Sequence, residues 1–369
     1  MNDPTTSEAP PAPPPSADDW RQLQRRSNAD PLFLGWEWQR VWWQCYGSAL
    51  PEAQLQTVTA RAADGALSAL APLYVHRARR LPLLNLRSLQ LVGGAWRDDR
   101  VMLSEYLEPL CATTGGKPGQ LLSRMAQLEW DEFVATLTPR DGQFHDALRS
   151  WCTENRWLLR ELDVSESYQA HLGAGFDAYT RALPAGARRR LLNNRARLRQ
   201  QGEVTLRTLD AADVMAGLDT LNALHARRWR QAAYDTGRLE FLRALHAILP
   251  EGAMPIVSLM EVADSVVSAL YDIRVGTRQY NLQMGFDPAF DRSVSLGLLH
   301  LGHAMEQAAA ARVDCYDFLG GSGKHTNYKA RISTGTRALA TLQVVRHPAA
   351  SAIYRVRDLA RGRTPLNPR

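Results

Sequence analysis

The stretch that decides the fold comprises QYNLQMGF, DPAFDRSVSLG and LLHLGHAMEQAAAA, numbered 279–286, 287–297 and 298–311. The first segment is typical of an apolar strand, the second is a loop of mostly small residues, and the third is an uninterrupted helical run. A strand that enters a helix through such a loop leaves backbone N–H groups unpaired at the positive end of the helix dipole. The sequence therefore predicts a site for a phosphate or pyrophosphate group at residues 292–298.

Length and charge set the broad class of the protein. A chain of 369 residues is long enough for two domains with sizeable cores, and 45 % apolar with 22 % charged residues is ordinary for a soluble protein. The net charge of +6 comes almost wholly from arginine, because the only lysines are Lys117, Lys324 and Lys329. This balance suits an anionic cofactor or substrate and is too small to indicate nucleic acid by itself.

Cysteine and histidine spacing predicts no metal site. The four cysteines are scattered without a C-x-x-C pair: Cys45, Cys111, Cys152 and Cys315. This usage fits reduced thiols in a cytoplasmic protein. His300 and His303 lack the i, i+4 spacing of a zinc-binding helix, so surface histidines are expected there.

The two ends of the chain are predicted to lie outside the folded units. Residues 1–29 are Pro-rich at their start and lack the apolar core of a signal peptide, which predicts a disordered tail. Residues 349–369 are expected to form a short helix and a basic tail. No apolar run is long enough to span a bilayer, so no membrane insertion is expected.

Both halves of the chain show a helix, then a β-meander, then strand and helix segments. In the first half, helices are predicted at 33–47, 119–128 and 143–156, and strands at 55–62, 66–76, 131–136 and 157–162. In the second half, helices are predicted at 176–201, 211–230 and 238–248, and strands at 203–209, 255–262, 265–275, 278–286 and 336–346. This order predicts an α/β fold with a mixed sheet, built from tandem units at 30–165 and 166–348. The last strand is assigned to the sheet of the second unit.

Motifs in the second half resemble a known family. They are His225-x-x-Arg228-Trp229, Gly285-Phe286-Asp287-Pro288, Ser295-x-Gly297, Tyr316-Asp317-Phe318-Leu319 and Tyr328-Lys329. In order and spacing they resemble the CelD/BcsL, FemAB-like branch of the GNAT acyltransferase superfamily. The resemblance implies tandem GNAT-like domains. It also implies transfer of an acyl group from acyl-coenzyme A, or in some relatives from aminoacyl-tRNA, to an amine or a hydroxyl.

The resemblance assigns the strand-to-helix loop to the cofactor. In the family this loop holds the pyrophosphate of acyl-coenzyme A and has the pattern Arg/Gln-x-x-Gly-x-Gly/Ala, which the loop matches with Ser295 at the first glycine. The cofactor residues implied are Arg292, Ser293, Ser295, Gly297 and Leu298. A phosphate would pair with Arg292, and the small Gly297 would let it approach the backbone. The alternative is an ordinary helix start that Ser295 caps.

Four residues are candidates for the chemistry. Asp317 stands in an otherwise apolar strand, so it must be paired or have a shifted pKa, and Lys329 is its expected ion-pair partner. This pair either fixes the loop between them or acts in catalysis. Tyr328 is a candidate acid for a leaving thiolate or a packed aromatic residue, and His225 is a candidate base.

Three residues are predicted to face the acceptor. Arg228 and Trp229 share a helix face with His225, and Tyr280 lies in the strand before the cofactor loop. The alternative places this helix face beneath the cleft, with Trp229 in the core.

A basic helix is the main competing signal. Residues 187–202 (ARRRLLNNRARLRQQG) carry six arginines and no acid. They predict either contacts to the phosphates of a nucleotide-linked or tRNA substrate or a solvated basic face.

These patterns together predict a cytoplasmic acyltransferase. It would use acetyl-coenzyme A or another acyl-coenzyme A, no metal, and a small-molecule or saccharide acceptor, since the family is associated with envelope and exopolysaccharide clusters. Positioning and oxyanion stabilisation would supply most of the rate enhancement. The alternatives are an aminoacyl-tRNA-dependent transferase of the FemAB kind, which would bind tRNA, and a non-catalytic binding module with a GNAT fold.

Overall fold

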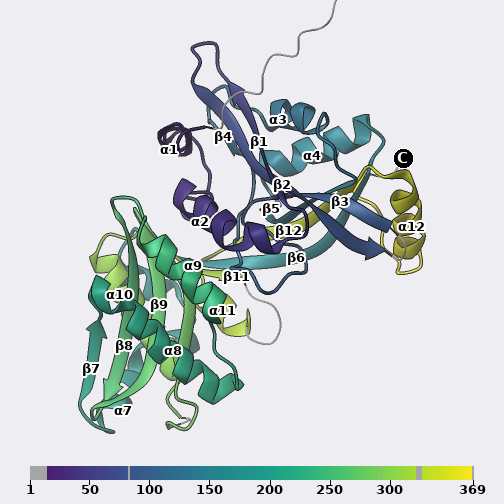
Figure 1. Cartoon of the computed structure of the whole chain (residues 1–369). Coiled ribbons are helices and arrows are strands. Elements are labelled where there is room, and N and C mark those ends of the chain that lie inside the picture. Colours follow the sequence, from purple (N-terminus) through teal and green to yellow (C-terminus); the bar gives the residue numbers. More distant parts are fainter. Residues whose placement is uncertain (1–14, 82–83, 292, 321–325, 368–369) are drawn as a thin grey trace, which may run out of the picture.

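A single mixed sheet runs through both halves of the molecule (Figure 1). The computed structural model describes residues 15–81, 84–291, 293–320 and 326–367. The strands, in their order across the sheet, are β1 (Gln54–Arg61), β2 (Leu67–Leu81), β3 (Leu84–Leu91), β5 (Glu132–Pro139), β12 (Gly335–Val345), β6 (Leu158–His171), β11 (Cys315–Gly320), β10 (Arg278–Phe286), β9 (Ser265–Val275), β8 (Ala253–Val262) and β7 (Val204–Thr208). The short strand β4 (Leu110–Cys111) pairs with β2. The predicted α/β fold with a mixed sheet is confirmed.

Helices cover both faces of the sheet. Those of the first half are α1 (Ala17–Arg25), α2 (Trp36–Tyr46), α3 (Pro118–Met125), α4 (Gln143–Glu154) and α12 (Pro348–Leu359). Those of the second half are α5 (Phe176–Ala182), α6 (Ala185–Arg188), α7 (Asn194–Arg199), α8 (Val214–Trp229), α9 (Thr236–His246), α10 (Leu296–Ala310) and α11 (Thr326–Ile332). Successive strand residues point to opposite faces, so α8 packs with Ala269 and Tyr271 while α10 packs on the face of Leu270.

An apolar cluster joins the two halves. Helix α2 of the first half packs against α9 of the second, where the rings of Trp38 and Phe241 meet edge to face at 4.9 Å between centroids. The same cluster holds Leu221 of α8 and Tyr271 of β9. Burial of these large rings fixes the first half against one face of the second half's sheet.

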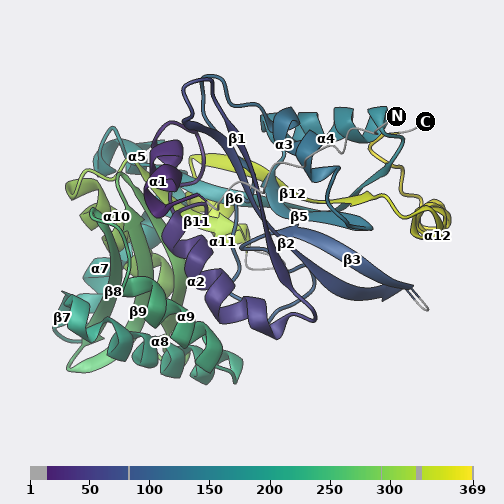
Figure 2. The same ribbon diagram turned by 45° about the horizontal axis from the view of Figure 1, so that its top comes forward.

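Strand β12 corrects one topological expectation. The sequence predicts a strand at 336–346 in the sheet of the second unit, and this assignment is wrong. β12 instead pairs antiparallel with β5 and with β6, among the strands of the first half (Figure 2). Its apolar side chains at 340, 342 and 344 join the core beneath α3 and α4. A period-two pattern identifies a strand but does not specify its partners, which explains the error.

Strand β6 links the two halves. Its first part pairs with β12 and its last part pairs with β11, where Ala170 stands opposite Tyr316. The boundary predicted at residue 165 therefore falls inside a strand rather than in a linker.

Helix α1 lies within the segment predicted as a disordered tail, so that prediction is wrong for residues 17–25. Ser16 caps this helix by accepting a hydrogen bond from the Asp19 N–H at 3.1 Å. Trp20 and Leu23 are buried, and the Trp20 indole donates to the Leu34 carbonyl. These two apolar residues follow the Pro-rich stretch too closely for composition to reveal them.

Helix α10 has a buried histidine where the sequence predicts a surface one. His300 is 1 % exposed, and its two ring nitrogens lie 2.9 Å from the hydroxyls of Ser258 and Ser268. Burial lowers the pKa of His300 to about 3, so the ring is neutral.

Among the helices that the structure describes, none combines the length and apolar character that crossing a bilayer needs.

Helix α10 packs closely against the π-helical turn η2 (Arg189–Asn193). This packing predicts that Gly→Ala substitutions change stability differently at different positions. A Cβ added at Gly302 would lie 2.6 Å from the Leu191 carbonyl oxygen, whereas one at Gly119 of α3 would meet nothing within 4 Å. We expect Gly302→Ala to lower the free energy of unfolding by about 1–3 kcal/mol. Gly119→Ala should leave it unchanged or raise it by up to about 1 kcal/mol. Urea unfolding of both variants measures this, and equal effects would contradict the packing described.

Candidate active site

The site begins where two parallel strands separate. β10 and β11 pair only from Arg278 opposite Cys315 to Tyr280 opposite Asp317. Immediately beyond, β10 carries a bulge between Asn281 and Gln283, where its register against β9 shifts. From this point, no strand of the described residues lies beside the edge of β10 that faced β11. The separation opens a cleft toward the start of α10.

A cavity of about 460 Å³ fills this cleft. It is lined by β10, the following loop, the first turn of α10, the end of α8 and the start of α11. Of the residues predicted for the site, the cavity brings together His225, Arg228, Trp229, Ser295, Gly297, Leu298, Tyr328 and Lys329. The volume lies within the range of small-molecule sites.

The loop before α10 places backbone N–H groups at the cavity. The first helical hydrogen bond runs from the Leu299 N–H to the Ser295 carbonyl, and the side chain of Ser295 makes no capping hydrogen bond. Ser295 therefore stands at the N-cap position, as the alternative expects, but its side chain caps no N–H group. The N–H of Leu296 donates to the Val294 carbonyl at 3.0 Å, whereas those of Gly297 and Leu298 have no partner within the helix and can bind an anion.

One predicted cofactor residue, Ser293, stands apart from this turn. Both the N–H and the hydroxyl of Ser293 donate to the carboxylate of Asp291, which lies 3.6 Å from Arg197. The N–H of Ser293 is thus already engaged by a carboxylate. Arg292 lies outside the described residues.

Gly297 has a packing role as well as a position at the cavity. A Cβ there would lie 3.2 Å from the Met284 sulfur and 3.3 Å from the Phe286 ring. The glycine therefore lets α10 approach β10 closely, which the sequence motif alone does not reveal.

The end of α8 supplies the aromatic and cationic wall. Trp229 is 44 % exposed, so the alternative that places it in the core is wrong. The Arg228 guanidinium lies 4.7 Å from the Trp229 ring and 4.4 Å from the Phe286 ring. His225 lines the same wall, and its Nδ1 lies 2.8 Å from the Gln231 carbonyl oxygen.

Lys329 contacts backbone carbonyls rather than Asp317, so the predicted ion pair is wrong. Its ammonium donates to the carbonyls of Phe318, Leu319 and Gly320 at 2.7, 3.2 and 2.6 Å. Leu319 has a φ of 58°, in the left-handed region. The pairing of β11 with β6 shifts register between Asp317 and Leu319, and the end of β11 turns there. Burial lowers the pKa of Lys329, and the nearby Glu105 and Asp317 oppose this shift.

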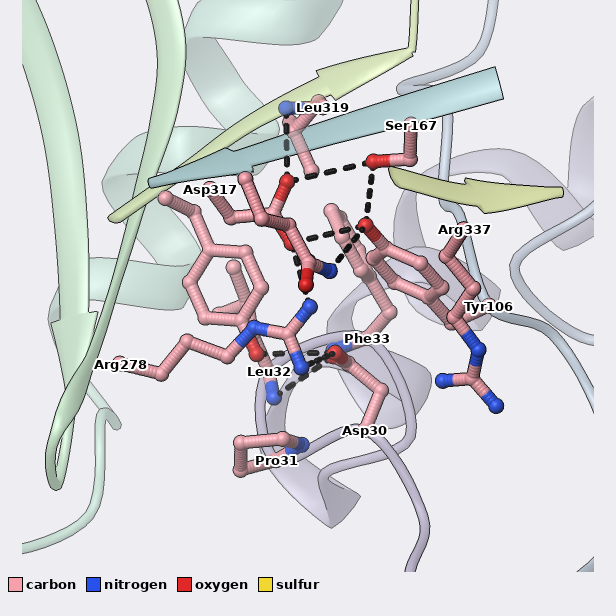
Figure 3. Close-up of polar contacts among 12 residues, drawn as sticks. Asp30, Pro31, Leu32, Phe33, Tyr106, Ser167, Arg278, Asp317, Leu319 and Arg337 are labelled. Carbon is pink, nitrogen blue, oxygen red and sulfur yellow. Dashed lines mark hydrogen bonds and ion pairs between the residues drawn. The ribbon is translucent and has the colours of Figure 1, made fainter. Parts of the chain in front are cut away.

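Asp317 is fully buried at the junction of the two halves (Figure 3). Its carboxylate pairs with the Arg278 guanidinium and accepts hydrogen bonds from the Tyr106 hydroxyl at 2.7 Å and the Leu319 N–H at 2.8 Å. Ser167 of β6 lies 3.3 Å away. Asp317 therefore binds the first half to β10 and β11 and lies away from the cavity wall.

Tyr280 also lies in this junction rather than in the cavity. Its hydroxyl donates to Asp30 at 2.9 Å, and the Asp30 carboxylate lies 3.7 Å from Arg278. Burial raises the pKa of Asp30, which the charge of Arg278 opposes. The predicted contact between Tyr280 and a substrate thus has no support in its position.

Glu105 supports the end of β11 behind the cavity wall, and sequence patterns do not identify it. Its two carboxylate oxygens accept the Gly320 N–H at 2.8 and 2.9 Å, beside the carbonyls that Lys329 holds. Burial raises the pKa of Glu105 to about 8, with a further contribution from Asp317. The only signal in the sequence is a lone acid next to Tyr106, without a motif around it.

Among the described residues, no group of three His, Cys, Asp or Glu side chains is placed to hold a metal ion.

Comparison with known proteins agrees with this geometry. Residues 185–330 match the family profile described as "Acetyltransferase (GNAT) domain". Over this segment the chain therefore resembles a GNAT-type acetyltransferase domain. The segment contains the cavity and every described residue assigned to the cofactor. A search of curated proteins finds no match.

Solved structures extend the likeness in fold to nearly the whole chain. The crystal structure of FemX superposes with a TM-score of 0.60 at 10 % identity, covering 92 % of this chain and 98 % of that one. The C-terminal domain of a putative lysylphosphatidylglycerol synthetase from Agrobacterium fabrum gives 0.50 at 11 % identity, with 93 % and 95 % covered. L-PGS from Bacillus licheniformis gives 0.50 at 8 % identity, with 94 % and 96 % covered. These likenesses show a shared fold over nearly the whole chain, and the tandem GNAT-like arrangement stays a prediction.

Burial of Glu105 predicts a dependence of stability on pH. The folded protein binds the Glu105 proton more tightly than the unfolded chain, whose glutamate titrates near 4.5. Stability is therefore lost as the pH rises from about 5 to about 8. In urea unfolding, Glu105→Gln should reduce the loss of unfolding free energy between about pH 5 and about pH 8 by at least about 1 kcal/mol. The exposed Glu251→Gln is the control, and a Glu105→Gln curve parallel to that of the wild type would contradict this role.

Proposed function

We propose that the chain transfers an acyl group from acyl-coenzyme A, bound in the cavity, to an amine or a hydroxyl. The observation that carries this proposal is the meeting of an anion-binding helix start, a free strand edge and polar side chains in one cavity of the GNAT-type domain. Few ligands other than an acyl-coenzyme A combine a pyrophosphate, an extended amide chain and a reactive carbonyl.

Each part of this ligand has a proposed position. The pyrophosphate binds the N–H groups of Ser295, Gly297 and Leu298 at the positive end of α10. The amide chain lies along the edge of β10 that β11 leaves unpaired, as an added strand would. This arrangement directs the thioester toward Tyr328 and Lys329.

The chemistry follows from the side chains near that end of the cleft. The acceptor attacks the thioester carbonyl, a C–N or C–O bond forms, and the C–S bond breaks. Burial raises the pKa of Tyr328 to about 12, so the phenol keeps a proton that it can donate to the leaving thiolate. The ammonium of Lys329 stabilises negative charge that develops during the attack.

His225 is the proposed base that accepts the acceptor's proton. A carbonyl oxygen only accepts, so the contact with Gln231 places the hydrogen on Nδ1. Nε2 then carries the free lone pair. Arg228 and Trp229 form the wall against which the acceptor binds.

The acceptor that we propose is a small molecule or a saccharide, in keeping with the CelD/BcsL-type resemblance and its exopolysaccharide association. Arginine and tryptophan suit a polyhydroxylated or anionic acceptor, because they combine donors with a flat apolar face. We place this activity in the cytoplasm.

Aminoacyl-tRNA is the second candidate donor, and one feature favours it. Arg189, Arg190 and Arg199 are exposed on the basic segment, whereas Arg195 pairs with Glu306 at 2.7 Å. Salt-dependent tRNA binding that is lost when these three exposed arginines become serine would support this donor. A folded protein that binds coenzyme A but transfers to no acceptor would be a non-catalytic binding module.

Charge at the helix start tests the cofactor site. Ser295→Asp keeps a good capping residue at the N-terminus of α10, so thermal stability should be unchanged or higher. Its negative charge should lower the affinity for acetyl-coenzyme A by at least about tenfold, because it repels the pyrophosphate. Calorimetry measures the thermal stability and the affinity for acetyl-coenzyme A of Ser295→Asp. The exposed Ser48→Asp is the control. Equal affinity in wild type and Ser295→Asp would refute this position for the pyrophosphate.

Removal of one hydroxyl tests the proposed acid. Tyr328→Phe should lower kcat by about 10²–10³-fold, with stability and coenzyme affinity unchanged. Tyr168→Phe, whose hydroxyl contacts Glu166 instead, should keep full turnover. Thiol release with a panel of amine and sugar acceptors provides the assay. Undiminished turnover of Tyr328→Phe would exclude the tyrosine as the acid.

A further inference from the structure

Helix α12 presents an apolar face to solvent. Val356 is 69 % exposed and Leu359 is 80 % exposed, the two highest values among the large apolar side chains of the described residues. Ile353, at 39 %, lies one turn before them. A protein surface usually carries such residues singly, so three on one helix mark an interaction site.

This face is not left over from poor packing of the helix. Ala350, Tyr354 and Asp358 form the buried side and dock on the first half. The Asp358 carboxylate receives two hydrogen bonds from Arg160, at 2.6 and 2.7 Å, and the Arg160 guanidinium lies 4.2 Å from the Tyr354 ring. The helix is thus firmly held by one side.

The opposite side has no polar residue at its centre. At 100° per residue it comprises Ala352, Ile353, Val356, Leu359 and Ala360, and all five are exposed. A surface helix ordinarily has polar residues on the side away from the core. Here the outer side is apolar, and none of the residues that the structure describes covers it.

Positive charge borders the outer face. Arg355 and Arg357 flank it on the helix, and Arg361 and Arg363 follow directly and are exposed. The only acid of the helix is Asp358, which is buried against Arg160. An apolar strip with arginine on both sides matches an anionic lipid surface, where the strip enters the acyl boundary and the arginines contact headgroups.

We propose that α12 docks the protein onto an anionic lipid surface through Ile353, Val356 and Leu359. The helix lies at the end of the first half that is far from the second half in both views (Figures 1 and 2). Docking there leaves the cavity of the second half uncovered, and the inference holds whatever reaction that cavity performs. The contact is peripheral and is distinct from insertion across a bilayer.

Vesicle sedimentation of the full chain tests this proposal. We expect binding to phosphatidylcholine vesicles with about one third phosphatidylglycerol, and at least about tenfold weaker binding to phosphatidylcholine alone. Val356→Ser with Leu359→Ser should weaken binding to the anionic vesicles by at least about tenfold. Leu55→Ser with Met254→Ser, at 47 % and 48 % exposure on other elements, is the matched control and should bind like wild type.

An arginine double variant and a measurement of the oligomeric state complete the test. Arg357→Ser with Arg361→Ser should remove the preference for anionic vesicles and its dependence on salt. The proposal would be overturned if the wild-type protein did not bind anionic vesicles. It would also be overturned if the Val356→Ser, Leu359→Ser variant bound them as strongly as the wild type. Sedimentation equilibrium tests the alternative of a protein interface. If the wild type formed a dimer and bound no vesicles, and the Val356→Ser, Leu359→Ser variant were a monomer, the face would be an interface between proteins and the proposal would be overturned.

Discussion

A single partly buried arginine connects the parts of this molecule. Arg278 begins β10, pairs with Asp317 of β11, and lies 3.7 Å from Asp30 of the first half. Its guanidinium also lies 5.0 Å from the Tyr106 ring. Two fully or nearly buried carboxylates need a cation, so removal of Arg278 would leave charge in the interior, which in proteins typically costs about 3–5 kcal/mol. The arrangement of the two halves depends on this group.

The same interaction sets where the candidate site opens. β10 and β11 remain paired only as far as Tyr280 and Asp317, and the cavity begins at the next residue of β10. Beyond that point the end of β11 turns at Leu319, and its carbonyls gather around Lys329. Glu105 of the first half holds the N–H of Gly320. The first half therefore supports the cavity wall from behind, whereas the residues that line the cavity all lie within 185–330.

Local patterns in the sequence predict the elements better than their partners. The strand, loop and helix at 279–311 are where they are expected, because their periodicity is local, and eight predicted residues meet in one cavity. The place of β12 and the helix α1 within the Pro-rich tail depend on distant packing, which no short pattern contains. The predicted partner of Asp317 is wrong for the same reason. Lys329 is the nearer cation in sequence, but strand pairing brings Arg278 beside the carboxylate.

Hydrogen–deuterium exchange with and without acetyl-coenzyme A tests the central claim most directly, because it reports on backbone N–H groups themselves. The account predicts slower exchange at saturating ligand for residues 281–286 of β10 and for the first turn of α10 from Ser295. Strand β8 and helix α4, away from the cavity, should exchange at unchanged rates. Protection confined to the first half, or none at the start of α10 despite demonstrated binding, would contradict the assignment of this cleft to the acyl donor.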